Sequence, residues 1–408
     1  MIGRSPCLTF WYSSACGPRP FQHEELNQPL PISRPGTEPS EEISITYQEY
    51  FDAVREFVLK NLPKISELLR EGEEPAGIDS IDIICEKHGS DYHPARLRVH
   101  SPCATRSFVL NVAITERGKD RLQREFQVLR RLEHHHAASY IPKVYLKDQI
   151  PLTTGGNPHV SVFLGEWFDD YHEFHLWQPL HTAPPRIVVW NTNQSGHERL
   201  SQLEEEEVFR RAAFILTEFY NLRTMEEIFP WHHAAGDFVV NKTPLGIDVR
   251  LITVRQYARR VEFSCEISEQ PVKALELFLA NLTIRMRLDR LDGVGQVAWA
   301  GNTSVKGTLA GFFDGLKVKY RRTADEQEII TSFLKGMRIM PLEKLAELFG
   351  AVLHSYNPAS PDWSIVKEKL VDHIFEVYQG LRDFFSADGP WESLDSPETL
   401  EGGSTSCS

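Results

Sequence analysis

The spacing of apolar positions predicts a leading helix followed by a β-rich segment. From Tyr50 onward apolar side chains recur three or four positions apart, and Thr46 with Glu49 forms a capping-box pattern just before them. Pro63 falls inside this pattern and is expected to end or restart the helix. From Ile78 the apolar period becomes that of strands. The sequence therefore predicts an antiparallel meander of three strands, at residues 80–86, 95–100 and 106–114.

A second helix with one apolar face is predicted over residues 119–133, where Leu122 and Leu129 share a stripe with Glu125. A carboxylate on a buried stripe needs a partner, for which Arg96 and Arg98 are the candidates; the alternative is that Glu125 reaches water at the edge of the stripe. The pattern then predicts three more strands and a long helix, at residues 141–146, 160–165, 186–190 and 203–222.

The segment from Trp231 to Gln256 predicts a β-hairpin preceded by a carboxylate. Two β-type runs, at residues 238–240 and 247–254, are separated by a turn that contains Pro244 and Gly246. Asp237 comes directly before the first run. After the hairpin the pattern is helical, with amphipathic helices predicted at residues 272–288, 308–319, 325–337, 341–354 and 363–385.

The two ends of the chain have compositions that predict disorder. Residues 1–42 are rich in proline among polar residues, and residues 387–408 are acidic and then rich in glycine and serine. Neither segment holds enough apolar side chains to offset the entropy lost on ordering.

Length and charge narrow the functional classes. The chain has 408 residues, which is enough for two or three lobes with separate cores. A formal net charge of −13 argues against a protein that coats nucleic acid or an anionic membrane. The sequence holds no apolar run long enough to span a bilayer, and its six cysteines show no paired spacing. We therefore expect a cytoplasmic protein, with no indication of which small molecule or protein is its partner.

The order of the predicted elements resembles the kinase-like phosphotransferases, particularly the aminoglycoside phosphotransferase and choline kinase branch. The motif His233-Ala234-Ala235-Gly236-Asp237 is similar to the His-Gly-Asp loop of that family, with two extra alanines. The resemblance implies an α+β, two-lobed fold of the protein-kinase type. Its parts are a leading helical segment at residues 43–77, an antiparallel-sheet N-lobe with one helix at 78–168, and a mostly helical C-lobe at 169–386.

The resemblance also implies roles for residues around an interlobe cleft. Asp237 matches the loop carboxylate that orients the acceptor hydroxyl, and Glu125 matches the glutamate of the N-lobe helix. Glu166 and Phe168 fall at the hinge, where adenine is normally bound; the alternative is that this segment is simply the aromatic end of a strand.

Three positions depart from the family pattern and put ATP and Mg²⁺ binding in doubt. Asn111 stands where the third strand should carry the phosphate-binding Lys, and Thr253 stands where the metal-binding Asp should be. Asn241 follows Asp237 by four residues instead of five, and the alternative is that it only opens the turn of the hairpin. Arg255 is the candidate to replace the missing Lys.

Two functions remain open from the sequence. The first is a pseudoenzyme that binds a nucleotide or a partner in the interlobe cleft. The second is an active ATP-dependent phosphotransferase for small molecules that uses Asp237 as its base. A separate set, His172, Glu173 and His175, could bind a metal, with a solvated loop as the alternative.

Overall fold

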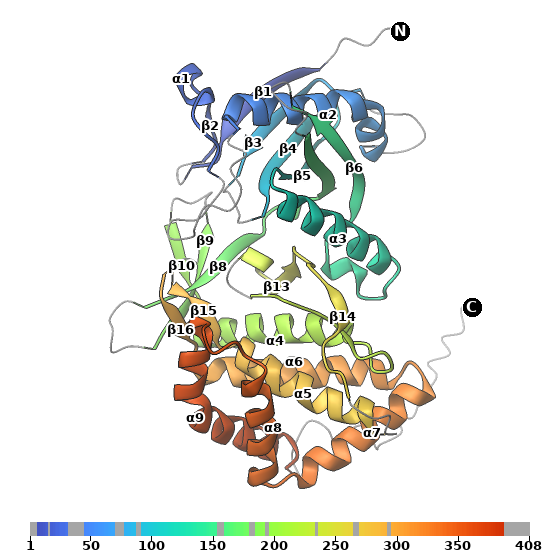
Figure 1. The fold of residues 1–408 in the computed structure, drawn as a ribbon, viewed down its shortest axis with the longest axis vertical. Coiled ribbons are helices and arrows are strands. Elements are labelled where there is room, and N and C mark those ends of the chain that lie inside the picture. Colours follow the sequence, from blue (N-terminus) through green and yellow to red (C-terminus); the bar gives the residue numbers. More distant parts are fainter. Residues whose placement is uncertain are drawn as a thin grey trace, which may run out of the picture.

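The computed structural model describes most of the chain as a mixed α/β protein with two buried apolar clusters (Figure 1). The described residues are 6–14, 17–31, 45–69, 77–86, 91–152, 159–178, 184–191, 196–232, 236–263, 269–291 and 295–386.

The N-terminal part is built on a seven-stranded sheet with the strand order β2-β1-β3-β4-β5-β7-β6. The predicted meander is confirmed, because β3, β4 and β5 are paired antiparallel in sequence order. Alternate residues of these strands, such as Leu97, Val99 and Leu110, face the apolar core that helix α2 (Tyr47–Leu68) shares. The strands are β1 (Cys7–Tyr12), β2 (Arg19–Pro20), β3 (Ser80–Cys85), β4 (His93–His100), β5 (Thr105–Ala113), β6 (Val144–Pro151) and β7 (His159–Glu166).

The prediction of a disordered leader is wrong for much of residues 6–31. Strand β1 pairs in parallel with β3 along its whole length, and a short helix α1 (His23–Leu26) follows. The ring centroids of Phe10 and Phe21 each lie 4.8 Å from that of Phe51, so the leader has an apolar surface to bury. Residues 1–5, 15–16 and 32–44 of this region, and the predicted tail at 387–408, lie outside the described residues.

Helices α2 (Tyr47–Leu68) and α3 (Glu116–Leu132) both pack against the sheet, but their buried side chains belong to different apolar cores. The predicted capping box of Thr46 and Glu49 forms at the start of α2, whose Phe57 is fully buried in the N-terminal core. Pro63 does not end α2, which continues to Leu68 because its apolar face stays packed beyond that point. On α3 the side chains of Leu122 and Leu129 instead belong to the second core.

A second sheet has the strand order β10-β9-β8-β12-β13. The predicted hairpin is present as β12 (Phe238–Thr243) and β13 (Gly246–Leu251). The expectation of a solvated loop around His172 is wrong: this segment forms β8 (His172–Trp177), because Phe174 and Leu176 alternate into the core. The outer strands are β9 (Arg186–Asn191) and β10 (Gly196–Arg199).

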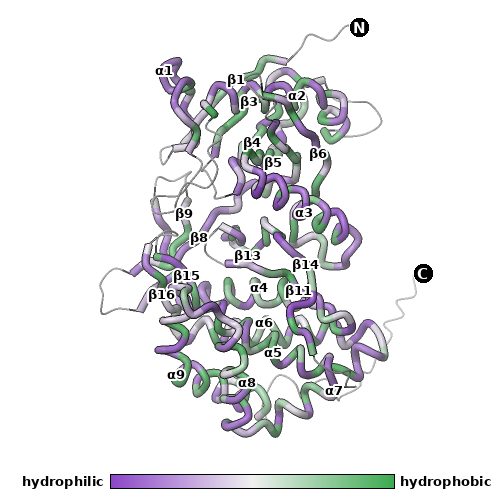
Figure 2. The backbone as a smooth tube through the Cα atoms, viewed as in Figure 1, coloured by the Kyte–Doolittle hydropathy of each residue, from purple (hydrophilic) through white to green (hydrophobic). Residues whose placement is uncertain are grey.

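The rest of the chain is helical, with two small two-stranded sheets. Figure 2 shows hydrophobic stretches along α4 and α6 where the two helices lie together in the interior. The helices are α4 (Gln202–Phe219), α5 (Gln270–Arg285), α6 (Asn302–Tyr320), α7 (Ala324–Ile339), α8 (Leu342–His354) and α9 (Pro361–Phe384). The small sheets pair β11 (Glu226–Ile228) with β14 (Tyr257–Arg259) and β15 (Leu288–Arg290) with β16 (Val297–Trp299). Among the described residues, every helix is too short or too polar to cross a lipid bilayer.

Candidate functional site

Asp237 lies directly before β12 and is buried, with 1% of its surface exposed. Gly236 before it has a φ of +79°, a backbone conformation that favours glycine and turns the chain into the strand. The Ile252 N–H donates to the Asp237 carbonyl oxygen at 2.7 Å, which fixes the loop to the end of the hairpin. The sequence motif therefore places a carboxylate in a constrained, water-poor position.

Both carboxylate oxygens of Asp237 are hydrogen-bonded inside the protein. Arg255 donates from Nη1 to Oδ2 at 2.6 Å and from Nη2 to Oδ1 at 2.7 Å, in a bidentate arrangement. The backbone N–H of His232 donates to Oδ2 at 2.8 Å. Burial alone would lower the pKa of Arg255, but the charge and hydrogen bonds of Asp237 raise it above its ordinary value. Arg255 is thus positively charged at neutral pH.

Glu125 on α3 is also buried, with 2% of its surface exposed. Its Oε1 accepts a hydrogen bond of 2.7 Å from the backbone N–H of Val254, which joins α3 to the chain just after β13. Burial raises the pKa of Glu125, and a hydrogen bond from Tyr92 and the charge of Arg255 oppose that shift. Glu125 faces inward as predicted, yet its hydrogen bond comes from Val254, with Tyr92 and Arg255 near enough to affect its pKa, and not from the second-strand arginines.

The histidine next to the loop is a neutral, partly buried group. Burial, and then the positive charge of Arg285, lower the pKa of His232 to about 4. Arg285 itself donates to the carbonyl oxygen of Trp231 at 2.9 Å. His232 therefore contributes no charge near Asp237 at neutral pH. The neighbouring His233, named in the sequence motif, lies outside the described residues.

The positions matched to nucleotide binding are spread over the N-terminal sheet and the segment after it. Asn111 lies on β5 opposite Phe163 of β7, on the sheet face that α3 covers. Glu166 ends β7 and accepts a hydrogen bond of 3.1 Å from the backbone N–H of Lys143. The Phe168 ring contacts that of Tyr171, with centroids 5.6 Å apart, in the connection from β7 to β8. None of these three residues contacts Asp237 or Glu125 through any bond found among the described residues.

The two positions matched to metal binding lie in different environments. Asn241 is in the middle of β12 and pairs with Asp248 of β13, so the alternative that it opens the turn is wrong. Thr253 follows β13 and is partly exposed. Over the part of the chain that the structure describes, histidine, cysteine, aspartate and glutamate form no group of three that could hold a metal ion.

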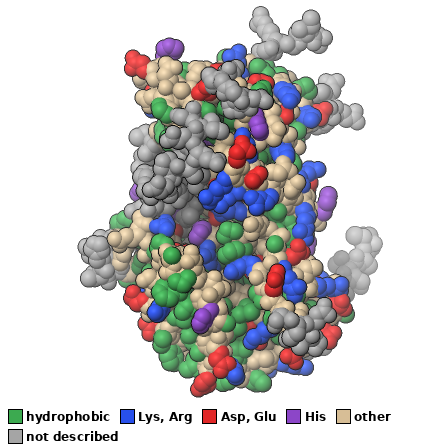
Figure 3. Space-filling model, in the orientation of Figure 1, with side chains coloured by type: hydrophobic (Ala, Val, Ile, Leu, Met, Phe, Trp, Pro, Cys, Tyr) green, Lys and Arg blue, Asp and Glu red, His purple; other side chains and the backbone are tan. Residues whose placement is uncertain are grey.

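Arg96, a candidate partner of Glu125, and two arginines of the hairpin region have partners of their own. Arg96 donates to Asp169 at 2.5 Å and lies over the Trp167 ring, away from Glu125. Of the arginines that follow the hairpin start, Arg250 pairs with Asp248 and Arg260 lies 3.7 Å from the Phe229 ring centroid. They do not converge on one anion site. Lys and Arg side chains also gather at the level of α3 on the face seen in Figure 3.

Two features of this region were missed by the sequence analysis. Tyr92 lies close enough to Glu125 to oppose the rise in its pKa, although nothing in the loop sequence of Tyr92 signals that role. The second feature is the group of aromatic and basic residues on β8, β9 and β10. The members of this group are Trp177, Trp190, His197 and Arg199. The sequence signal that could have found them is the alternation of side chains along short strands, which places them on one face.

Comparison with known proteins adds a distant structural likeness. No protein-family model matches the sequence, and no curated protein matches it. Among solved structures, one crystal structure described as a kinase domain is similar at 11% sequence identity, with a TM-score of 0.28. The match covers 74% of this chain and 89% of that one. A likeness this distant shows neither a common activity nor a common ligand, and membership of the aminoglycoside phosphotransferase branch stays a prediction.

Proposed function

We propose that this protein is a kinase-like pseudoenzyme, a two-lobed binding protein that does not transfer phosphate. The main support is the bidentate pair of Asp237 and Arg255, which engages the carboxylate predicted to orient an acceptor hydroxyl. A catalytic base must be within hydrogen-bond reach of a substrate proton. Asp237 is instead buried and already accepts three hydrogen bonds.

The residues present do not fit ATP and Mg²⁺. The family pattern needs a cation at the position of Asn111, a second metal ligand at Asn241 and a carboxylate at Thr253. Arg255 is the candidate to replace the missing Lys, but its guanidinium forms an ion pair with Asp237. Asp237 and Arg255 therefore balance each other's charge within the protein, and the hydrogen bond between Glu125 and Val254 holds α3 to the chain just after β13.

The proposal predicts that Mg²⁺ adds nothing to any effect of ATP alone on the thermal unfolding midpoint, and that the protein does not hydrolyse ATP. A ligand that binds the folded state raises the midpoint by mass action, so the titration reports binding directly. ATP alone, ATP with Mg²⁺ and Mg²⁺ alone are compared on the purified full chain, in parallel with an assay for phosphate release.

The alternative, an active phosphotransferase, predicts the opposite pattern. It requires a Mg²⁺-dependent rise in the midpoint and a phosphate-release rate that Asp237→Asn abolishes while the variant stays folded. That pair of results would overturn the pseudoenzyme proposal. Arg223→Gln, which removes an exposed ion pair with Asp325, is the control for general effects of losing an arginine.

A further inference from the structure

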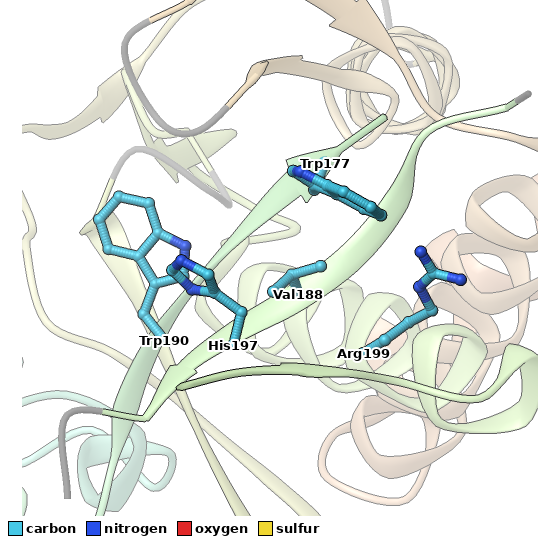
Figure 4. A pocket seen from close by; sticks show the side chains of 5 residues that line it. All are labelled: Trp177, Val188, Trp190, His197 and Arg199. Carbon is cyan, nitrogen blue, oxygen red and sulfur yellow. The ribbon is translucent and has the colours of Figure 1, made fainter. Parts of the chain in front are cut away.

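The outer strands of the second sheet form an aromatic and basic face that the Asp237 network does not use. One face of β8 and β9 packs into the core through Phe174, Leu176 and Ile187. The opposite face presents the other alternate residues of these strands and of β10. A cavity of about 410 Å³ lies on this face, lined by Trp177, Val188, Trp190, His197 and Arg199 (Figure 4).

The cavity has an apolar floor between two indole rings. Figure 4 shows Val188 between Trp177 on one side and Trp190 with His197 on the other. The centroids of the Trp190 and His197 rings are 5.7 Å apart. Flat aromatic side chains beside a small apolar floor are suited to stacking against a planar ring, whose π face any of them can contact.

Arg199 adds a positive charge at the edge of this cavity. Its guanidinium lies 4.9 Å from the centroid of the Trp177 ring, and the residue is exposed. It forms no ion pair with any residue that the structure describes, unlike the arginines near the hairpin. A guanidinium with free donors next to a stacking surface is suited to an anionic group such as a phosphate.

Besides Arg199, the same face holds a buried histidine, His175, whose ring nitrogens lack hydrogen-bond partners among the described residues. It lies opposite Val188 in the strand register, is 2% exposed, and its ring centroid lies 4.3 Å from that of Trp190. Within the described ranges neither of its ring nitrogens has a hydrogen-bond partner, and Glu173 approaches Nε2 only to 3.6 Å. Buried polar groups without a partner are rare in proteins and often mark binding sites.

We propose that this face binds a small planar aromatic ring that carries an anionic group, the chemistry of a nucleoside monophosphate. The cavity volume is in the range typical of pockets for small molecules. A nucleic-acid polymer is disfavoured because the chain carries a formal charge of −13, which repels a polyanion over the rest of its surface. The site is separate from Asp237 and does not depend on the pseudoenzyme proposal.

The test is isothermal titration calorimetry of the full chain with AMP, adenosine and inorganic phosphate. AMP is expected to bind at one site at submillimolar to millimolar concentration, and adenosine about tenfold more weakly because it lacks the charge that Arg199 contacts. Trp190→Leu is expected to weaken AMP about tenfold through lost stacking. Arg199→Gln is expected to weaken AMP while leaving adenosine unchanged, a split that a general loss of structure would not produce.

Matched controls separate the site from the fold. Trp363→Leu removes an indole from α9, and Arg223→Gln removes a distant guanidinium; neither is expected to change AMP binding. Circular dichroism confirms that each variant is folded. The inference is overturned if AMP does not bind, if Trp190→Leu and Arg199→Gln both bind it normally, or if a single-stranded oligonucleotide binds more tightly than AMP. Loss of AMP binding in Asp237→Asn alone would overturn it too, and would place the nucleotide at the Asp237 network instead.

Discussion

The guanidinium of Arg255 and the carboxylate of Asp237 form a bidentate ion pair across 18 residues of sequence, with Asp237 almost fully buried. Strands β12 and β13 run antiparallel, so the chain after β13 returns to the point where β12 begins. This brings Arg255 next to Asp237. A buried carboxylate is stable only when it is paired, so Arg255 is required by Asp237 whatever the function of the site.

Arg255→Gln is expected to destabilise the fold by about 2–3 kcal/mol, because it leaves the Asp237 carboxylate buried without a counter-ion. This is below the cost for a fully buried pair, since the Arg255 side chain is 30% exposed. Denaturant unfolding measures the change. The double variant with Asp237→Asn is expected to lose less than the sum of the two single variants, because both remove the same interaction. Additive losses would contradict the pairing.

Gly311→Ala is expected to destabilise the helical part by at least about 2 kcal/mol through overpacking. A Cβ at Gly311 of α6 would clash with the carbonyl oxygen of Arg210 on α4, and one at Gly307 would clash with that of Glu206. Gly350→Ala is the matched control: its Cβ meets nothing within 4 Å, and the substitution is expected to stabilise α8 by about 0.5–1 kcal/mol. Equal effects of the two substitutions on the thermal midpoint would contradict the close approach of α4 and α6.

Glu227 is expected to make stability fall with rising pH between about 4.5 and 7. Burial raises its pKa from 4.5 to about 7, against the opposing charge of Arg260. Over that window the folded protein keeps a proton that the unfolded chain releases, so the unfolded state binds fewer protons and stability decreases as pH rises. The difference between an unfolded pKa of 4.5 and a folded pKa of about 7 corresponds to roughly 3–4 kcal/mol at most.

Glu227→Gln removes this titration and is expected to flatten the dependence of unfolding free energy on pH over the same window. Denaturant unfolding of both proteins at a series of pH values gives the comparison. Glu343→Gln, on the exposed surface of α8, controls for the loss of a carboxyl group that faces water. Parallel profiles for the natural protein and Glu227→Gln would show that Glu227 does not titrate in this range.

Local signals in the sequence were enough to predict those elements whose contacts are between residues close together in the chain. The capping box at Thr46, the meander and the hairpin each depend on neighbouring residues, and all three are present. The inward position of Glu125 followed from the helical stripe. Its partners did not, because Val254 is 129 residues away and Tyr92 lies in a loop with no regular pattern.

The elements that were missed depend on partners distant in the chain. Strand β1 is stabilised by β3, some 70 residues later, and its proline-rich surroundings favoured disorder on composition alone. On β8, Glu173 and His175 alternate with the core residues Phe174 and Leu176. The polar residues therefore favoured a solvated loop in the sequence analysis. Pairing across the sheet overrides local preference in both cases.

Phe10→Ala is expected to destabilise the protein, because β1 is part of the N-terminal sheet and not a dispensable leader. Phe10 is partly buried against Phe51, and removing its ring is expected to cost about 1–2 kcal/mol, less than for a fully buried phenylalanine. Phe375→Ala is the matched control, since Phe375 is 50% exposed on α9. Thermal and denaturant unfolding of the full chain measure both. If the two variants unfold alike, with no loss for Phe10→Ala, then β1 does not contribute to the stability of the sheet and the original prediction of a disordered leader would be restored.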